Sequence, residues 1–425
     1  MLDPRTLAKR RDEIVESCRR RRVMVNVDAA IHAQERFAAA QTELGEANRQ
    51  RNEHQASGKR PLTGPARDAH AAEGRRLKHE IAGLEAAVAE AERALEDALE
   101  SIPNLVHPET PAGGEADFRE LRRVGTPRKF AFDPLDHVAL GEKLALIDFE
   151  AGAKVTGQKF YFLKNQAVLL DLALQRLALD TVMRAGYTPF ATPDLARKDV
   201  VDGLAFSPRG AETQIYSISG MDLDLIGTAE ITLGGLHADE ILEEASLPLR
   251  LAGVSHCFRT EAGAAGRESR GLYRVHQFTK VEMFVIARPE DSEALHAEIL
   301  ALEESIFQAL EVPYRVVEVA AGDLGAPAYR KFDIEAWLPG RGEGGDWGEV
   351  TSCSNCTDYQ ARRLRIRFKR QAERRNELVH TLNGTGIAVS RALIALLENH
   401  QQEDGSIAIP KALRPHLGLD RIGPR

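Results

Sequence analysis

The sequence predicts an α+β fold: an antiparallel sheet flanked by helices, preceded by an N-terminal arm of two antiparallel coiled-coil helices. The first hundred residues carry two narrow apolar seams with alternating spacings of three and four. The later part holds short apolar strands without regular β-α-β alternation, which favours an antiparallel sheet over a doubly wound one. The 425 residues suffice for one large and one small domain, which we expect at residues 1–110 and 111–425.

The arm is predicted from apolar residues in two separate segments. Residues 57–65, which lie between the segments, contain two glycines and two prolines and must break any helix. About 30 residues per helix at about 1.5 Å each give a hairpin about 45 Å long. The seams consist of Ala30, Ala33, Phe37, Ala40, Leu44 and Ala47, and of Leu77, Ile81, Leu84, Val88, Ala91 and Leu95. A spacer or dimerisation coil would show the same seams, so the arm alone does not identify a partner.

After a proline- and glycine-rich linker that ends near Gly114, the pattern becomes mixed. Helices are expected at residues 167–184, 292–310 and 387–399. Strands are expected at residues 223–226, 251–258, 273–286, 314–319, 332–337 and 378–382. No G-x-G-x-x-G opens a helix and no G-x-x-x-x-G-K-[ST] is present, so a nucleotide would bind without a Rossmann or P-loop cradle.

Composition and charge set limits on the class of protein. The formal net charge of −8 argues against a surface coated in basic residues, but a local positive stripe would suffice for a nucleic acid. No apolar stretch approaches the roughly 18 to 20 residues that a membrane span needs. The N-terminus lacks the apolar core of a signal peptide. We therefore expect a cytoplasmic protein that has no membrane partner.

The cysteines could suggest a metal site. Cys353 and Cys356 have the C-x-x-C spacing of half a zinc site. No second C-x-x-C and no H-x-x-x-H accompanies them, so the sequence offers no pair to complete a tetrahedral site. We therefore expect no zinc.

Several predicted strands carry charged side chains on one face. Period-two alternation places His276, Phe278, Lys280 and Glu282 on the same face of one strand. Similar short-range pairs are Arg259 with Glu261, Thr228 with Glu230, and Asn383 with Thr385. A buried face with these residues is costly unless the charges are paired or meet a ligand. A solvated outer face is the alternative, but four such groups in one domain favour a polar cleft for a charged, nucleotide-sized ligand.

Five segments resemble the signature motifs of the seryl class II aminoacyl-tRNA synthetases. Residues 225–230 resemble the Thr-Ala-Glu element of that family, and residues 258–278 resemble its motif 2 around a glycine-rich loop. Residues 348–363 are similar to its next signature, and residues 380–386 lead into a motif 3 that contains Arg391 and ends at residues 404–407 and 413–415. Residues 167–193 look like motif 1, which forms the subunit interface in the family. These elements occur in the family's order, so the resemblance covers essentially the whole chain.

The resemblance implies both an architecture and an activity. It implies the class II catalytic fold for residues 111–425, a tRNA-binding domain with a helical arm for residues 1–110, and a homodimer. The implied enzyme is a bacterial or organellar-type ligase that uses ATP with Mg²⁺ to activate L-serine and then loads it onto tRNA(Ser). The alternatives are a paralogue that serves a non-tRNA acceptor or acts as a regulatory binding module, and a coiled-coil scaffold. The scaffold would explain only residues 25–100.

The resemblance also implies roles for individual residues. Arg259 and Arg391 would be catalytic, because guanidinium groups grip phosphate and carboxylate oxygens bidentately. Serine would be bound by Thr228, Ala229, Glu230, Arg259, Glu282, Asn383 and Thr385. ATP would be bound by Arg259, Thr260, Glu261, Arg274, Val275, Phe278, Glu349, Val350, Thr351, Ser352 and Arg391. Glu349 and Ser352 would hold Mg²⁺, which prefers hard oxygen donors. The sequence departs from the commonest family pattern at Gly227, Thr351, Thr385 and Ser390.

Overall fold

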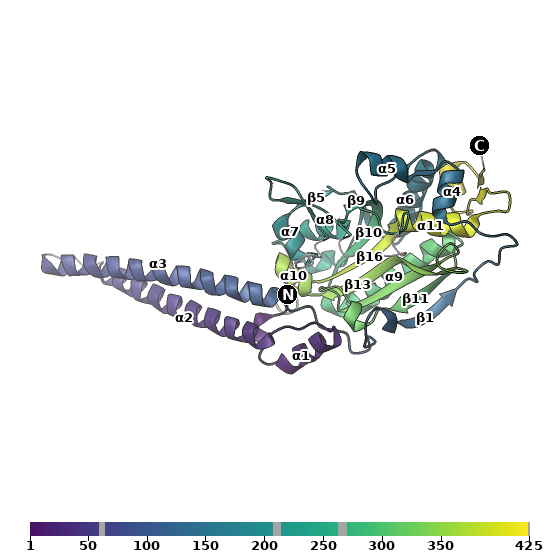
Figure 1. The fold of residues 1–425 in the computed structure, drawn as a ribbon. Helices are drawn as coiled ribbons and strands as arrows, with labels where there is room; N and C mark the ends of the chain where they lie inside the picture. The colour runs from purple at the N-terminus through teal and green to yellow at the C-terminus, as the bar shows by residue number, and fades with distance from the viewer. Residues whose placement is uncertain (59–63, 207–213, 262–269, 424–425) are drawn as a thin grey trace. The chain divides into compact units, whose positions relative to one another are not determined.

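The structure, a computed structural model, describes residues 1–58, 64–206, 214–261 and 270–423 (Figure 1). These residues form two compact units, Met1–Leu105 and Val106–Arg425. Among them, no helix combines the length and the hydrophobicity that a membrane span requires. The glycine-rich loop of the motif 2 resemblance and the centre of the predicted hairpin turn lie outside the described residues.

The first unit is built on two long helices, α2 (Val27–Ser57) and α3 (Pro65–Glu100), which pack along one another (Figure 1). The side chain of Asn26 caps α2 by accepting a hydrogen bond from the backbone N–H of Ala29 at 3.0 Å. Proline at the first turn of α3 suits a position that needs no N–H donor. The tilted rings of His54 and His70 contact one another with centroids 3.8 Å apart, so these two positions face each other across the hairpin. The predicted two-helix arm is confirmed.

The arm buries one apolar stripe per helix. Its buried seam residues are Ala30, Ala33, Ala47, Leu77, Ile81 and Leu95, and the other predicted seam residues are half-buried. Two shorter helices, η1 (Pro4–Thr6) and α1 (Arg11–Arg20), pack against α2. Leu7, Ile14, Leu99 and Ile102 are fully buried. The unit therefore has a core of its own.

The second unit is built on an eight-stranded sheet in the order β1-β11-β12-β13-β16-β10-β9-β4 (Figure 1). Its strands are β1 (Arg119–Val124), β4 (Thr188–Ala191), β9 (Leu249–Phe258), β10 (Gln277–Ala287), β11 (Tyr314–Glu318), β12 (Arg330–Leu338), β13 (Asp346–Thr357) and β16 (His380–Ala388). Every neighbouring pair is antiparallel except β4 with β9. The predicted α+β class with an antiparallel sheet is confirmed.

Alternation along β10 separates the two faces of this sheet. Val281, Met283 and Val285 belong to the main core with residues of α6 (Gln166–Arg184), α9 (Ser292–Ala309) and α11 (Val389–His400). Phe284 and Ile286 point to the opposite face, into a second cluster with residues of α8 (Ala229–Gly235) and α10 (Tyr359–Leu364). Phe278, Lys280 and Glu282 share that second face, so helices cover one end of it and leave a polar region at the other.

Smaller elements complete this unit. They are η2 (Glu115–Asp117), α4 (His137–Lys143), β2 (Ile147–Asp148), α5 (Phe149–Val155), β3 (Phe162–Leu163), β5 (Leu195–Arg197), α7 (Lys198–Gly203), β6 (Tyr216–Ser217), β7 (Leu223–Leu225), β8 (Ile241–Glu243), η4 (Glu244–Ser246), η6 (Pro289–Asp291), η7 (Ala321–Asp323), β14 (Arg367–Arg370), β15 (Arg375–Leu378), β17 (Ile407–Ala408), α12 (Arg414–Leu417) and β18 (Arg421–Ile422). The strand expected at residues 223–226 is β7, which lies in a three-stranded sheet with β5 and β6.

The three predicted helices are confirmed to within two residues. The strand expected at residues 378–382 corresponds to the start of β16, which begins at His380 and continues to Ala388, while Leu378 ends the separate strand β15. The central strand β13 was not predicted at all. Its inner positions are largely Thr, Ser, Cys and Asn, so it lacks the apolar alternation by which a strand is recognised.

Candidate active site

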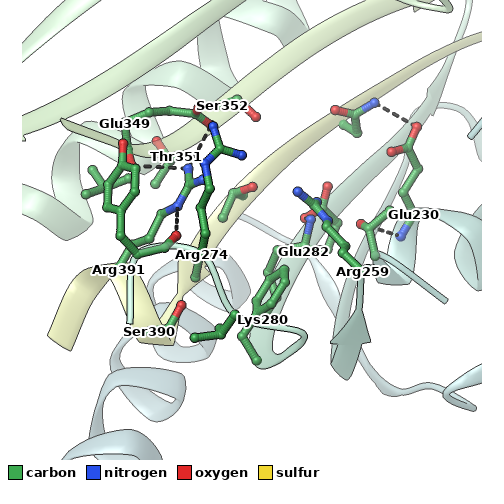
Figure 2. Close-up of a pocket in the computed structure, with 18 of the residues that line it drawn as sticks. Glu230, Arg259, Arg274, Lys280, Glu282, Glu349, Thr351, Ser352, Ser390 and Arg391 are labelled. Atoms are coloured by element: carbon green, nitrogen blue, oxygen red, sulfur yellow. Dashed lines mark hydrogen bonds and ion pairs between the residues drawn. The ribbon is translucent and has the colours of Figure 1, made fainter. Parts of the chain in front are cut away.

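A pocket with a volume of about 310 Å³ opens on the second face of the sheet, where β10, β12, β13 and β16 meet the start of α11 (Figure 2). It is lined by Phe206, Thr228, Glu230, Arg259, Glu261, Tyr273, Arg274, Val275, Phe278, Lys280, Glu282, Lys331, Glu349, Val350, Thr351, Ser352, Asn383, Thr385, Ala388, Ser390 and Arg391. The lining is mostly polar and charged, as the alternation of charged side chains along the strands predicted.

The structure brings all of the predicted site residues to this pocket except Ala229 and Thr260. Ala229 is the first residue of α8, and its buried methyl group packs in the second apolar cluster. The backbone N–H of Thr260 donates to the carbonyl oxygen of Gln214 at 3.2 Å. The roles of these two residues stay predictions, like those of the residues that line the pocket.

Carboxylates gather at one end of the pocket, where Figure 2 shows Glu230, Glu282 and Arg259 close together. Thr228 caps α8 by accepting a hydrogen bond from the backbone N–H of Glu230 at 3.2 Å. Glu230 Oε1 accepts hydrogen bonds from the side-chain amides of Gln360 at 2.7 Å and Asn383 at 2.8 Å. These contacts fix the Glu230 carboxylate without supplying a positive charge.

The second carboxylate, Glu282, is paired with the neighbouring side chain on its own strand. Lys280 Nζ lies 2.5 Å from Glu282 Oε2. A bulge in the pairing of β10 with β16 falls between Val281 and Glu282, so that Glu282 lies opposite Thr385. Burial raises the pKa of Glu282, Lys280 lowers it and Glu230 raises it again, which leaves it at about 7.

Arginines and a third carboxylate gather at the other end, where Figure 2 shows Arg274, Arg391 and Glu349. Arg391 Nη1 lies 3.1 Å from Glu349 Oε1, and its guanidinium carbon lies 4.7 Å from the centre of the Tyr273 ring. Arg274 Nη1 contacts Glu261 Oε2 at 3.4 Å. Each arginine pairs with a carboxylate here, and a guanidinium group can also donate to phosphate oxygens.

Glu349 is the group best suited to a metal ion. Its side chain is 38% exposed because it faces the open pocket. Burial opposes its ionisation, yet the charges of Arg391 and Lys331 bring the pKa of Glu349 down to about 2. It is therefore an ionised oxygen donor at neutral pH, and the hydroxyl of Ser352 lines the same pocket. In the described part of the chain, no group of three or more His, Cys, Asp or Glu side chains is placed to hold a metal alone.

The C-x-x-C pair does not form half of a metal site. Both cysteines lie on β13, where residues three apart point to opposite faces. Cys353 packs in the main core, whereas Cys356 Sγ is 3.7 Å from the side-chain amide of Asn383. Two thiols on opposite faces of a strand cannot bind one ion together.

Several lining residues were missed in the sequence. The alternation along its strand placed Lys280 on the pocket face, but nothing there assigned it a role. Lys331 comes from β12 and carries no local signal, because its approach to the pocket depends on the pairing of β12 with β13. Phe206 reaches the pocket because Gly227 leaves room: a Cβ at Gly227 would lie 2.3 Å from the Phe206 ring. This contact gives a physical reason for the glycine.

Comparison with known proteins shows the same organisation. The model of the seryl-tRNA synthetase N-terminal domain matches residues 1–106, and that of the tRNA synthetase class II core domain (G, H, P, S and T) matches residues 217–400. Serine--tRNA ligase of Treponema denticola is 52% identical over 424 residues, which cover 100% of both chains. That of Dictyoglomus thermophilum is 62% identical over 77% of this chain and 76% of its own.

A solved structure agrees with these sequence matches. Seryl-tRNA synthetase from Pyrococcus horikoshii, whose crystal structure is complexed with ATP, superposes with a TM-score of 0.89. The two chains share 40% sequence identity, and the match covers 100% of each. On the strength of relatives this similar over its full length, the chain belongs to the seryl-tRNA synthetase family of class II synthetases.

Proposed function

We propose that this chain is a serine–tRNA ligase, which activates L-serine with ATP to give seryl-adenylate and then transfers serine to tRNA(Ser). The observation that carries the proposal is the polarity of the pocket: buried carboxylates at one end and paired arginines with an ionised glutamate at the other. Serine offers an ammonium to the first end, and ATP offers phosphates to the second. Arg259, which Figure 2 shows beside Glu282, would meet the groups that react.

The carboxylate end suits the amino group and hydroxyl of serine. Glu230 and Glu282 would receive the ammonium, and Arg259 the carboxylate. Thr385 and Asn383 would bond the hydroxyl, since both line the pocket and Thr385 lies opposite Glu282. A site built to bond a hydroxyl rejects alanine strongly, because its own polar groups would be left unpaired. Threonine would be excluded by the size of the site.

The arginine end suits ATP. Arg391 would bind the distal phosphates, and Phe278 would stack on the adenine. Glu261 would accept a hydrogen bond from the adenine amino group. Arg259 now lies over the Phe278 ring with its guanidinium carbon 5.3 Å from the centre. A shift of this side chain would expose the ring to the base and bring the charge to the α-phosphate.

The proposed reaction needs positioning and charge neutralisation more than acid–base catalysis. An oxygen of the serine carboxylate attacks the α-phosphorus, the bond to the bridging oxygen breaks, and pyrophosphate leaves. The carboxylate is already ionised at neutral pH, so no base has to remove a proton. The second step follows when a terminal hydroxyl of tRNA attacks the carbonyl carbon of the adenylate and AMP leaves.

Mg²⁺ is proposed to accompany ATP. Glu349 and Ser352 provide two hard oxygen donors, and Mg²⁺ commonly takes the rest of its shell from phosphates and water. When bound, the ion would neutralise phosphate charge. This fits a site shared with the nucleotide better than a cage made by the protein alone.

A homodimer is proposed from the surface of α6. Val168, Leu169 and Leu172 are large apolar residues at 43%, 46% and 58% exposure on a helix that otherwise packs into the main core. Apolar groups clustered on one helix are typical of an interface, and a two-fold dimer is the commonest closed assembly. We further propose that the arm binds tRNA(Ser) and that the enzyme works in the cytoplasm, where its substrates are.

Two assays with one variant test the activity. Serine-dependent ATP–pyrophosphate exchange should proceed without tRNA, and charging of tRNA(Ser) should follow when tRNA is added. Arg259→Ala should lower exchange by about 10²- to 10³-fold, the effect typical of losing one electrostatic contact to the reacting group. Arg123→Ala is the matched control, since Arg123 pairs with Glu120 on the exposed strand β1. Exchange without charging would point to a paralogue with another acceptor.

A further inference from the structure

Lys280 is a buried ammonium that the proposed reaction does not use. Its side chain is 6% exposed and that of its partner Glu282 is 2% exposed. Both lie on β10 and line the pocket. A buried lysine is costly unless its charge is compensated, so its presence beside a ligand site needs a reason.

The reason lies in the second buried carboxylate, Glu230 on α8. The negative charge of Glu230 raises the pKa of Glu282, because two like charges close together repel one another. The bonds that Glu230 accepts from Gln360 and Asn383 come from neutral amides. Two cations favour the charged form of Glu230: Lys280 has the larger effect and Arg259 the smaller.

Arg259 is not available as a permanent counter-charge. It belongs to the loop after β9, where it donates to the carbonyl oxygen of Gly227 at 3.4 Å and lies over the Phe278 ring. Under the proposed function it is engaged by the serine carboxylate and the α-phosphate. Lys280 is therefore the resident positive charge for the two glutamates.

We infer that Lys280 sets the charge of the ammonium site, which consists of Glu230, Glu282 and Lys280. When both carboxylates are ionised, they and the one ammonium leave a net charge of −1, which one substrate ammonium neutralises. Without Lys280, two buried carboxylates would lie together, and one of them would take up a proton and lose its attraction for the substrate. Lys280 is therefore a positioning residue. It does not touch the substrate, but it keeps Glu282 ionised, and Glu282 attracts the substrate ammonium.

The other groups around Glu282 do not replace Lys280. Cys257 on β9 is buried, and burial raises the pKa of its thiol, so it is neutral. Glu303 on α9 is fully buried, and burial raises the pKa of this carboxyl well above its usual value. Together with Glu230 and Arg259, these two groups are coupled to Glu282 from other elements of the described chain.

The inference rests on the proposed function and is tested by the pH profile of Lys280→Met. The measured quantity is kcat/KM for serine and for ATP in pyrophosphate exchange between pH 6 and 9. Loss of the positive charge raises the pKa of the carboxylates, so the acid limb of kcat/KM for serine should move up by about one pH unit or more. At pH 7 the KM for serine should rise about tenfold, whereas the KM for ATP should change less than about twofold. The difference should shrink as the pH rises.

Two variants serve as controls. Lys280→Arg keeps the charge and should restore the wild-type acid limb. Lys164→Met removes a lysine of an exposed pair, 2.8 Å from Asp148, and should leave the limb unchanged. If Lys280→Met does not fold, Lys280→Gln removes the same charge with a polar side chain and should show the same shift.

The possible results separate the inference from the proposed function. Uncharged variants that fold, with slower turnover but an unmoved acid limb, would make Lys280 a structural residue and overturn the inference. An unmoved limb would leave the proposed function intact, provided that the wild-type enzyme exchanges with serine. A wild-type enzyme that fails to exchange would overturn the proposed function itself.

Discussion

Arg391 is held by Glu349 at two points, since its Nη1 lies 3.1 Å from the carboxylate Oε1 and 3.1 Å from the main-chain carbonyl oxygen of the same residue. One residue opens α11 and the other lies on β13, so the contact joins two elements more than 40 positions apart in the chain. The Tyr273 ring lies against the guanidinium, 4.7 Å from its centre. The proposed phosphate and metal groups are thus organised before any ligand arrives.

This arrangement predicts a specific defect in Arg391→Lys. Lysine keeps the charge but has no planar fork that could contact Glu349 through one nitrogen and the Tyr273 carbonyl oxygen through another, at 3.5 Å, while stacking on the Tyr273 ring. We expect kcat/KM for ATP to fall by about 10- to 100-fold with little change in the KM for serine. Pyrophosphate exchange with ATP varied at saturating serine measures this. Arg421→Lys, at an exposed pair with Asp404, is the control. An unchanged KM for ATP would mean that Arg391 only braces Glu349.

The sequence predicted the arm well because a two-helix hairpin depends on local periodicity. Its seam repeats at intervals of three and four, and each helix buries only that stripe. The central strand β13 shows the opposite case. It pairs on one side with β12, which directly precedes it in the sequence, and on the other with β16, from which α10, β14 and β15 separate it. Thr351 and Asn355 are buried there although their residue types are usually exposed.

Most residues of the candidate site could be predicted, because they belong to family motifs. The pKa values of their carboxylates could not be predicted. Family motifs indicated Glu282 and Glu349, and alternation indicated that Glu282 shares a strand face with Phe278 and Lys280. The state of each carboxylate depends on its burial and on its charged partners. For Glu282 these are Lys280 on its own strand and Glu230 on α8, whereas those of Glu349 come from other elements. Lys280 leaves the pKa of Glu282 near 7, while Arg391 and Lys331 hold that of Glu349 at about 2. Such differences arise from the tertiary packing of charges, which no spacing in the chain encodes.

The proposed homodimer makes a prediction for α6. Leu172 is 58% exposed beside Val168 and Leu169, so aspartate there would place a charge within the proposed apolar interface. The wild-type protein should run at twice the mass of the 46.8 kDa chain in light scattering at micromolar concentration. Leu172→Asp should shift the equilibrium to the monomer. Met221→Asp is the control, because Met221 is an exposed apolar residue outside α6. A monomeric wild type would contradict the proposal.

Glu303 makes a prediction about stability and pH. It is fully buried on α9, where its Oε2 accepts a hydrogen bond from the Thr351 hydroxyl at 2.9 Å. Burial raises its pKa well above the usual value, so the folded protein keeps a proton that the unfolded chain releases above about pH 4.3. The free energy of unfolding of the wild-type protein therefore falls as the pH rises from about 4.3 towards the raised pKa of Glu303.

Glu303→Gln should remove this loss. Glutamine keeps the acceptor for Thr351 and does not titrate, so its melting temperature relative to wild type should be higher at pH 8 than at pH 5, by about 2 °C or more. Glu304→Gln is the matched control, since the adjacent Glu304 pairs with Arg122 and accepts from Tyr314. That variant should melt lower at both pH values. A pH-independent difference for Glu303→Gln would show that the carboxyl is ionised in the fold.

The arm carries the last prediction, which separates the two steps of the reaction. None of the described residues that line the pocket comes from Met1–Leu105, so we expect serine activation to proceed without the arm. The base of the first unit has to be kept in a shortened protein, because Leu7, Ile14 and Leu99 form a buried core there. A deletion should therefore remove only the distal half of the hairpin and leave its base folded.

The His54–His70 contact gives the register for such a cut. Gln41 and Gly83 lie equally far from this pair along α2 and α3, so residues 42–82 can be replaced by a short glycine–serine linker. The segment removed includes the exposed Arg75 and Lys78. We expect serine-dependent pyrophosphate exchange within about twofold of wild type, because the pocket is untouched, and loss of tRNA(Ser) charging.

Salt gives an independent check on what the arm contacts. Lysine and arginine bind the phosphates of a nucleic acid by displacing counterions, so tRNA affinity should fall steeply as salt rises. Arg75 and Lys78 should account for part of that dependence, whereas Arg76 is engaged by Glu73 and Glu80 at 2.7 and 2.8 Å. The double variant Arg75→Ala/Lys78→Ala should bind tRNA(Ser) more weakly and with a shallower salt slope than Arg76→Ala. If the shortened enzyme charged tRNA with unchanged affinity, the arm would be a spacer, and the alternative that its seams left open would be correct.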